Sequence, residues 1–170
     1  LVYETSEEDL AVEASVVHEK DSRVEMISRA ITFWRSEAFV VKDGRLVKLG
    51  LPESVVASVT AGVLYVRLRE EWTPAGTQYK AGSLLALDLD EFLGGKRDFA
   101  VLFTPGPRVF LESFLPLKSV VILDLLDNVS SRLVEMRRGA DGRWSRREVD
   151  APRLANLNVA AYDRRESDEY

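Results

Sequence analysis

Apolar and polar residues alternate along most of this chain, and this period of two constrains the fold more than any other feature of the sequence. Successive side chains of a strand point to opposite faces, so runs such as Val63–Arg69 (VLYVRLR) and Ser83–Leu89 (SLLALDL) each predict a strand. Apolar residues recur at helical spacing far less often. The chain is therefore predicted to be all-β.

Strands of this kind are predicted from near the start of the chain to near its end. Many are rich in Val, Leu, Ile and aromatic residues, which suit a half-buried pleated surface. The candidates are Ala11–Glu19, Arg23–Phe33, Ala38–Lys42, Arg45–Leu49, Val55–Thr60, Val63–Arg69, Ser83–Leu89, Phe99–Phe103, Val109–Phe114, Ser119–Asp124, Arg132–Arg137, Trp144–Val149 and Leu157–Tyr162.

Turn-forming residues lie between several of these strands. Asp43-Gly44, Ala61-Gly62 and Asp141-Gly142 are suited to tight hairpins, so neighbouring strands should run antiparallel. One short helix is predicted at Asp90–Leu93, because acidic residues begin it and Gly94-Gly95 end it.

The strands fall into groups of four that begin near Ala11, Ser54, Val109 and Ala155. The intervals are close to the ~40–50 residues of a four-stranded propeller blade, and the excursion Trp72–Gly82 lengthens the middle one. This spacing is compatible with a partial, open β-propeller that has blade-like units at about 11–50, 54–104 and 108–150 and partial strands at both ends, the fold that the family resemblance described below favours. A β-sandwich has similar strand spacing, and periodicity alone does not separate the two folds.

Composition excludes several classes of protein. With 170 residues and 46% hydrophobic residues, the chain is long enough for one domain or part of one. Lys and Arg number 23 against 28 Asp and Glu, so the basic surplus of a nucleic-acid-binding protein is absent. No apolar run approaches the ~18 residues of a membrane helix, and the first residues do not resemble a signal peptide. We expect a soluble protein, cytoplasmic or periplasmic, that binds neither membrane nor nucleic acid.

Candidate catalytic residues are few. The chain has no cysteine, which excludes disulfides, thiolate metal sites and a cysteine nucleophile, and His18 is the only histidine. His18 lies in a strand pattern and is interpreted as an ordinary strand residue. Ser83 follows Gly82, but it lacks the second glycine of a G-x-S-x-G elbow and leads into a strand.

Carboxylates cluster at Glu70-Glu71, at Asp88 and Asp90, and at Asp124, Asp127 and Asn128. Strand alternation would place Asp88 and Asp90 on one face, where an acid–base pair or a Ca²⁺ site could form. The favoured interpretation is that these residues are polar strand ends and turn caps.

The remaining polar and aromatic motifs also have structural interpretations. Gly94-Gly95-Lys96-Arg97 ends a helical turn and does not have P-loop spacing. The basic residues around Ala140-Asp141-Gly142 are expected at a solvated hairpin tip, and the three tryptophans are expected to pack between blades. These basic residues are Arg137, Arg138, Arg143, Arg146 and Arg147, and the tryptophans are Trp34, Trp72 and Trp144. No catalytic, cofactor-binding or metal-binding residue is predicted, and no cofactor.

One segment has a more specific pattern. Trp72–Phe103 reads WTPAGTQYKAGSLLALDLDEFLGGKRDFAVLF and resembles part of the β-propeller domain in bacterial members of the prolyl oligopeptidase family of serine peptidases. Leu123–Val129 with Ser131–Leu133 resembles the hairpin of that family's penultimate blade, and Asp163–Tyr170 resembles the acidic stretch that opens a later blade.

The resemblance implies a propeller segment that gates the access of short peptides to an α/β-hydrolase domain outside this chain. Because the family's catalytic residues lie in that other domain, the resemblance assigns none here. The chain starts at Leu1 and ends after an acidic cluster, and we expect it to be part of a longer protein. The alternative is a free-standing β-rich interaction scaffold. We also expect self-association through exposed blade faces or strand edges, at Val2–Glu4 and Leu157–Tyr162.

Overall fold

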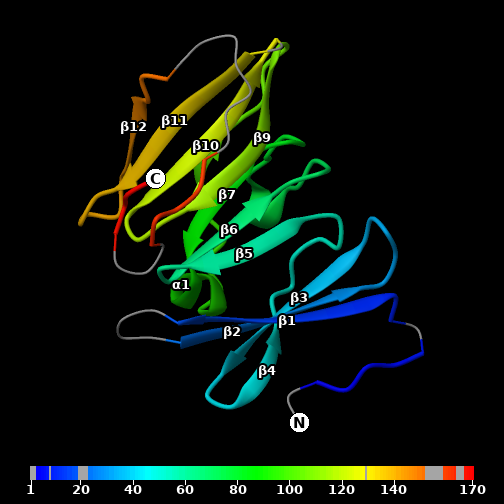
Figure 1. The fold of residues 1–170 in the computed structure, drawn as a ribbon. Coiled ribbons are helices and arrows are strands. Elements are labelled where there is room, and N and C mark those ends of the chain that lie inside the picture. Colours follow the sequence, from blue (N-terminus) through cyan, green and yellow to red (C-terminus); the bar gives the residue numbers. More distant parts are fainter. Residues whose placement is uncertain (1–2, 8, 19–22, 129, 152–158, 164–166) are drawn as a thin grey trace.

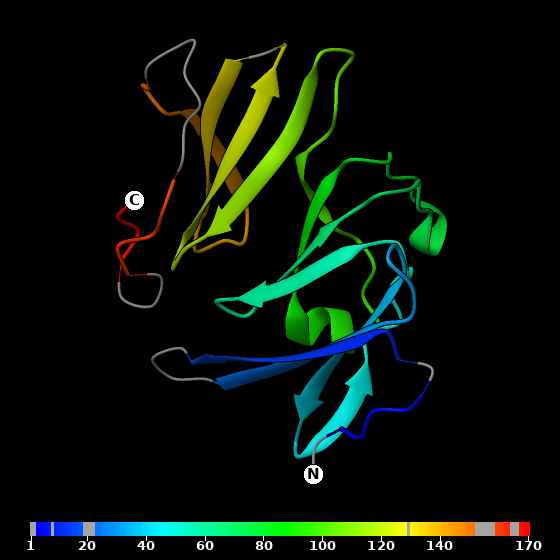
Figure 2. The same ribbon diagram turned by 45° about the vertical axis from the view of Figure 1, so that its right-hand side comes forward.

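The computed structural model describes residues 3–7, 9–18, 23–128, 130–151, 159–163 and 167–170. Its strands form three four-stranded antiparallel sheets, and in each sheet the strands are neighbours in sequence order. The sheets are stacked face to face in a fan, with the second sheet in the middle (Figures 1 and 2). The predicted all-β class with four-stranded antiparallel blades is confirmed.

The strand boundaries are as follows. The first sheet contains β1 (Ala11–His18), β2 (Arg23–Ala30), β3 (Ser36–Lys42) and β4 (Arg45–Lys48). The second contains β5 (Val56–Thr60), β6 (Val63–Arg67), β7 (Leu84–Asp88) and β8 (Ala100–Phe103). The third contains β9 (Val109–Pro116), β10 (Val120–Asp127), β11 (Ser130–Arg138) and β12 (Trp144–Glu148).

The predicted tight turns form where the residues allow a positive φ. Asp43 and Gly44 have φ of 50° and 71°, and Ala61 and Gly62 have φ of 49° and 68°, as the primed turns of two-residue hairpins require. The third turn differs from the prediction. Between β11 and β12 the chain needs the wider loop 139–143, in which the Gly139 and Arg143 backbones are hydrogen-bonded over 2.8 Å.

The predicted helical turn is present as α1 (Leu89–Leu93). The Asp88 side chain caps it by accepting hydrogen bonds from the backbone N–H groups of Asp90 and Glu91. The predicted strand Arg23–Phe33 was too long. β2 ends at Ala30, because the Thr32 hydroxyl accepts the Trp34 and Arg35 N–H groups in a turn. The described part of Leu157–Tyr162, residues 159–162, is not a strand, and Tyr3 and Glu4 are not either.

Alternation in the second sheet supplies two separate cores. Leu64 and Val66 of β6 face the first sheet, whereas Val63 and Tyr65 face the third. β7 divides in the same way, since Leu85 and Leu87 join the first core. This central sheet is therefore apolar on both faces, which explains the continuous apolar runs in β6 and β7.

The excursion between β6 and β7 covers the first core. Trp72 and Tyr79 form an isolated antiparallel bridge, and both rings contact Phe99, at centroid distances of 5.3 Å and 6.0 Å. The Tyr79 hydroxyl also accepts the Phe99 N–H at 3.1 Å. Segment 68–83 thus closes the space between the second sheet and α1, rather than forming a mobile surface loop.

The outer faces of the two terminal sheets are covered by chain ends. Val149, Ala151, Val159 and Ala161 pack against the outer core of the third sheet. On the first sheet, the Tyr3 ring lies 6.1 Å from that of Phe39, and Asp9 accepts a hydrogen bond from Arg29 of β2. Among the described residues, no helix is long and apolar enough to cross a membrane.

Truncating Leu64 tests the packing of the first and second sheets. Leu64 is fully buried in the first core, so Leu64→Ala should lower the free energy of unfolding by about 2–5 kcal/mol through lost burial and the cavity left behind. Val101→Ala, at an exposed position of β8, should change it by less than about 0.5 kcal/mol. Urea unfolding followed by tryptophan fluorescence measures both, and equal losses would contradict the assignment of this core.

Candidate functional site

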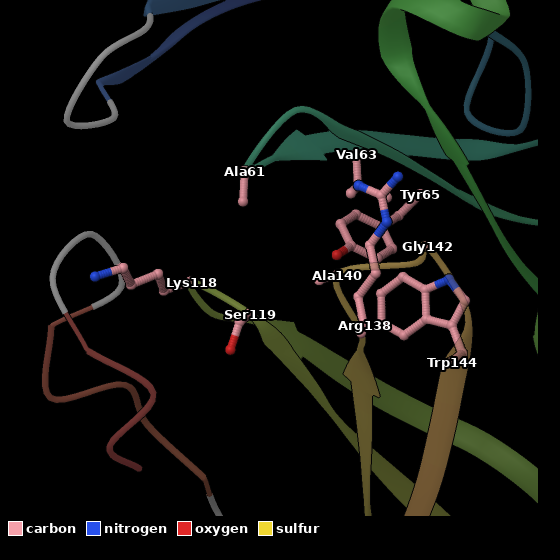
Figure 3. Close-up of a pocket in the computed structure, with 10 residues that line it drawn as sticks. Ala61, Val63, Tyr65, Lys118, Ser119, Arg138, Ala140, Gly142 and Trp144 are labelled. Carbon is pink, nitrogen blue, oxygen red and sulfur yellow. The ribbon is translucent and has the colours of Figure 1, made fainter.

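A hollow with polar and aromatic lining lies between the second and third sheets, at the end where their hairpin turns meet (Figure 3). Its volume is about 360 Å³. Each side comes from a turn or strand end, so the order of strands in the two sheets brings distant residues together. The lining residues are Ala61, Val63 and Tyr65 from the second sheet and Lys118, Ser119, Arg138, Gly139, Ala140, Gly142 and Trp144 from the third.

Two aromatic rings form the apolar part of this hollow. Tyr65 is buried in β6, and its ring lies edge-on to Trp144 of β12 with centroids 6.5 Å apart. Phe114 of β9 is also close, with its ring centroid 6.0 Å from that of Tyr65. These contacts belong to the second core, so the floor of the hollow is also structural packing.

Arg138, the last residue of β11, supplies a positive charge beside these rings (Figure 3). Its Nη2 lies 3.5 Å from Oδ2 of Asp88, the residue that caps α1. The ion pair links the third sheet to the end of β7. A second hollow of about 530 Å³ adjoins the first across Val63, Arg138 and Trp144, and is lined further by Glu91 and Lys96.

The described residues that line this hollow include a serine but no histidine. The Ser119 hydroxyl lies in the first hollow, and it donates to the Asp168 carboxylate. A serine nucleophile needs a base such as histidine beside it, and His18 is on β1 in the first sheet. In the described part of the chain, no group of three or more His, Cys, Asp or Glu side chains is placed to hold a metal ion.

The residues singled out from the sequence are dispersed over the structure. Ser83 is buried just before β7, where its backbone carbonyl accepts the Leu68 N–H. Asp88 and Asp90 do not share a strand face as predicted, because Asp90 is already in α1, where it pairs with Lys42 at 2.6 Å. Asp88 is the cap that the structural interpretation predicted.

The other acidic residues have local partners, with one exception. Glu70 accepts from Ser54, and Glu71 accepts from Gln78. Asp127 accepts from Asn128 and Arg132, as expected of a polar strand end.

Asp124 is the exception. Burial and the nearby Glu112 carboxylate raise the pKa of Asp124, although a hydrogen bond from Ser131 opposes this. Its Oδ1 is buried without a hydrogen-bond partner among the described residues. It lies beside a β-bulge and is not a cap.

The glycine-containing segment after α1 is a helix stop, as predicted. Gly95 has a φ of 99°, and the Arg97 guanidinium lies 3.9 Å from the centroid of the Phe92 ring. The prediction that the three tryptophans pack between blades is not met by all of them. Trp72 and Trp144 pack against cores, but Trp34 is 74% exposed, with Arg69 over its ring.

The basic residues of β11 and β12 are not all at a solvated tip. Arg143 is highly exposed, but Arg137 and Arg147 flank Glu135, which is only 5% exposed. The hydrogen bond from Arg147 and the charges of both arginines lower the pKa of Glu135, although burial opposes this. A carboxylate four positions before the turn, between two arginines on β11 and β12, was a signal for this cluster that sequence reasoning did not use.

The end of the chain completes this cluster. The Tyr170 hydroxyl lies 3.3 Å from Oε2 of Glu135, and Asp168 accepts the Ser119 N–H at 2.7 Å. Burial raises the pKa of Asp168, but the hydrogen bonds from Ser119 and the Arg137 charge outweigh burial, so its pKa is lowered.

The fold of this chain is similar to that of a known class of proteins. The described residues form three four-stranded antiparallel sheets, arranged as the blades of an open, partial propeller. It is similar to part of a solved post-proline cleaving enzyme from Rickettsia typhi, with a TM-score of 0.78 and 22% sequence identity. The match covers 88% of this chain and 23% of that enzyme, so the chain spans about a quarter of its length. No protein-family model matches the sequence, and no curated protein matches it.

The lowered pKa values of Glu135 and Asp168 predict loss of stability in acid. Because both carboxyls are more acidic in the folded state, their contribution is complete above the ordinary carboxyl pKa of about 4 and is lost as pH falls below it. The urea concentration at the midpoint of unfolding should therefore decrease as the pH is lowered from 6 to 3. Asp168→Asn should flatten this dependence, whereas Asp141→Asn on the exposed turn should not. An unchanged pH profile in Asp168→Asn would contradict the assignment.

Proposed function

We propose that this chain is a non-catalytic propeller segment of a prolyl oligopeptidase-like serine peptidase. The observation that carries the proposal is the structural similarity of 88% of the chain to a segment of a post-proline cleaving enzyme. The sequence resemblance at Trp72–Phe103 supports the same family independently, because it rests on residue types and not on the path of the backbone.

The proposed role is to gate substrates. Three sheets stacked through two apolar cores make a stiff wall, since interiors packed at crystal-like density deform little. A ring that includes such a wall would admit short peptides and exclude folded proteins from a hydrolase domain that lies outside this chain. The residues of the chain supply shape and rigidity, while the chemistry is performed elsewhere in the peptidase.

A second candidate function is that of an interaction scaffold without any hydrolase domain. It is favoured by the exposed aromatic pair Phe33 and Trp34, which are 84% and 74% exposed at the tip of the β2–β3 hairpin. Large exposed apolar side chains in neighbouring positions are typical of contact surfaces. The coding sequence around the chain separates the two functions: a G-x-S-x-G motif followed by Asp and His favours the peptidase.

The purified chain should not hydrolyse a chromogenic prolyl peptide, because no described serine has a histidine base beside it. Release of the chromophore should equal that of the buffer blank. Ser83→Ala is the control for a contaminating peptidase, since activity that persists in that variant cannot come from Ser83. Turnover that co-purifies with the chain and disappears in Ser83→Ala would contradict the proposal.

In the complete peptidase, weakening the contacts between the second and third sheets should allow longer substrates to be cleaved. Trp144→Leu removes the edge contact with Tyr65, and such aromatic pairs are worth about 0.5–1.5 kcal/mol, or roughly 2–10-fold in an opening equilibrium. Cleavage of a thirty-residue substrate relative to a five-residue one should rise by that factor. Val101→Ala on β8 is the matched control. An unchanged ratio in Trp144→Leu would argue against gating by this wall.

A further inference from the structure

The free edge of β1 differs from the other sheet edges in the described structure. β1 pairs with β2 over eight consecutive residue pairs without a register shift, and nothing described pairs with its other side. Its sequence, AVEASVVH, contains no proline and one carboxylate, Glu13. Proteins normally protect an edge of this length with charges, proline, bulges or a covering segment.

The five other edges each carry such a device. β4 and β8 have four residues each, β4 with Arg45 and Lys48 at its ends. β9 contains a bulge and ends at Pro116, and β12 carries Arg146 and Arg147. β5 is short, with five residues against the eight of β1. The open edge of β1 is therefore an exception within this fold.

The hydrogen-bond register shows which backbone groups of β1 point outward. Ile31 N–H donates to the Arg35 carbonyl at 2.9 Å, so alternate residues of β2 bond to β3 and the others, including Ser28 and Met26, bond to β1. Their partners are Glu13 and Ser15. The N–H and C=O groups of Val12, Ala14 and Val16 consequently point away from the sheet. No described residue bonds to them.

A hollow of about 440 Å³ lies beside this edge, between the first and second sheets. Glu13, Ser15 and Val17 of β1 line one side of it, and residues 56–60 of β5 line the other. Figure 2 shows β5 crossing next to the β1–β2 hairpin. Since most of these side chains are small, the hollow can take small side chains from a strand added alongside β1.

We propose that the free edge of β1 binds an extended peptide as a fifth strand of the first sheet. Backbone groups of Ala14 and Val16 would bond to the peptide, and alternate peptide side chains would enter the hollow, as in other cases of strand addition. This inference rests on the proposed function, because a propeller that admits peptides brings extended chains to its strand edges.

Charge favours a peptide over a second copy of this chain. Glu13 and Arg69 both line the hollow. The Arg69 guanidinium is engaged by the carbonyl and the ring of Trp34, whereas Glu13 forms no ion pair with the described residues, so a peptide ammonium group beside Glu13 is complementary. A second β1 would bring another Glu13 carboxylate to the same hollow. The expected ligand is a short peptide with a free N-terminus and small, uncharged side chains at alternate positions.

The probe is a seven-residue peptide of alternating valine and serine with a free N-terminus and a fluorophore at its C-terminus, titrated with the chain and followed by anisotropy. Saturable binding is expected. Ala14→Pro removes one outward N–H while leaving the β1–β2 bonds in place, and should weaken binding roughly 5–10-fold, as expected for a lost hydrogen bond. Ala14→Val keeps the N–H group and is the matched control. Equal urea midpoints would show that both variants fold.

Two further measurements separate the alternatives. Glu13→Gln should weaken binding of the free peptide but not of its N-acetylated form. Two further peptides carry methyl groups on the backbone nitrogens of either the odd or the even residues. Only the peptide whose methylated nitrogens face β1 should lose binding, and this test requires no change in the protein. Absence of binding, or equal binding by Ala14→Pro and Ala14→Val, would overturn the inference.

Light scattering of the chain alone gives the remaining outcome. A dimer that Ala14→Pro dissociates would show that a second copy occupies the edge, and would also overturn the inference. If peptide binding fails while the coding sequence contains the hydrolase triad, only this inference is lost and the proposed function stands.

Discussion

Burial of the second sheet on both faces is the constraint on which the rest of the structure depends. Val63 and Tyr65 pack toward the third sheet, and Leu64 and Val66 pack toward the first, so the pleat of one strand links two cores. A one-residue slip of β6 would exchange these two sets of side chains. The stacking of the three sheets therefore depends on the register that the Ala61-Gly62 hairpin sets.

The terminal sheets solve a different problem, because each has one face without a neighbouring sheet among the described residues. Both faces hold buried carboxylates that are paired with cations. Asp9 pairs with Arg29 on the first sheet, and Glu135 pairs with Arg147 on the third. A buried charge without a partner would be costly, and these pairs offset that cost. The chain ends cover the apolar parts of the same faces.

The polar groups of the described structure differ in whether they have structural partners. Polar side chains in the hollow between the second and third sheets are held by structural partners: Arg138 by Asp88, and Ser119 by Asp168. The first sheet has a strand edge whose backbone groups lack such partners. These outward-pointing backbone groups of β1 are the basis of the strand addition proposed above.

The sequence alone determined the elements that depend on near neighbours. Alternation predicted the strands, Asp43-Gly44 and Ala61-Gly62 predicted hairpins, and the acidic residues Asp90-Glu91 with Gly94-Gly95 predicted the helical turn, because pleat, turn and cap chemistry act within a few residues. Only the tertiary structure decided which side chains meet across sheets. The approach of Tyr65 to Trp144, the pairing of Glu135 with Arg147, the exposure of Trp34 and the open edge of β1 all depend on how the sheets stack, and local pattern carries no information about that stacking.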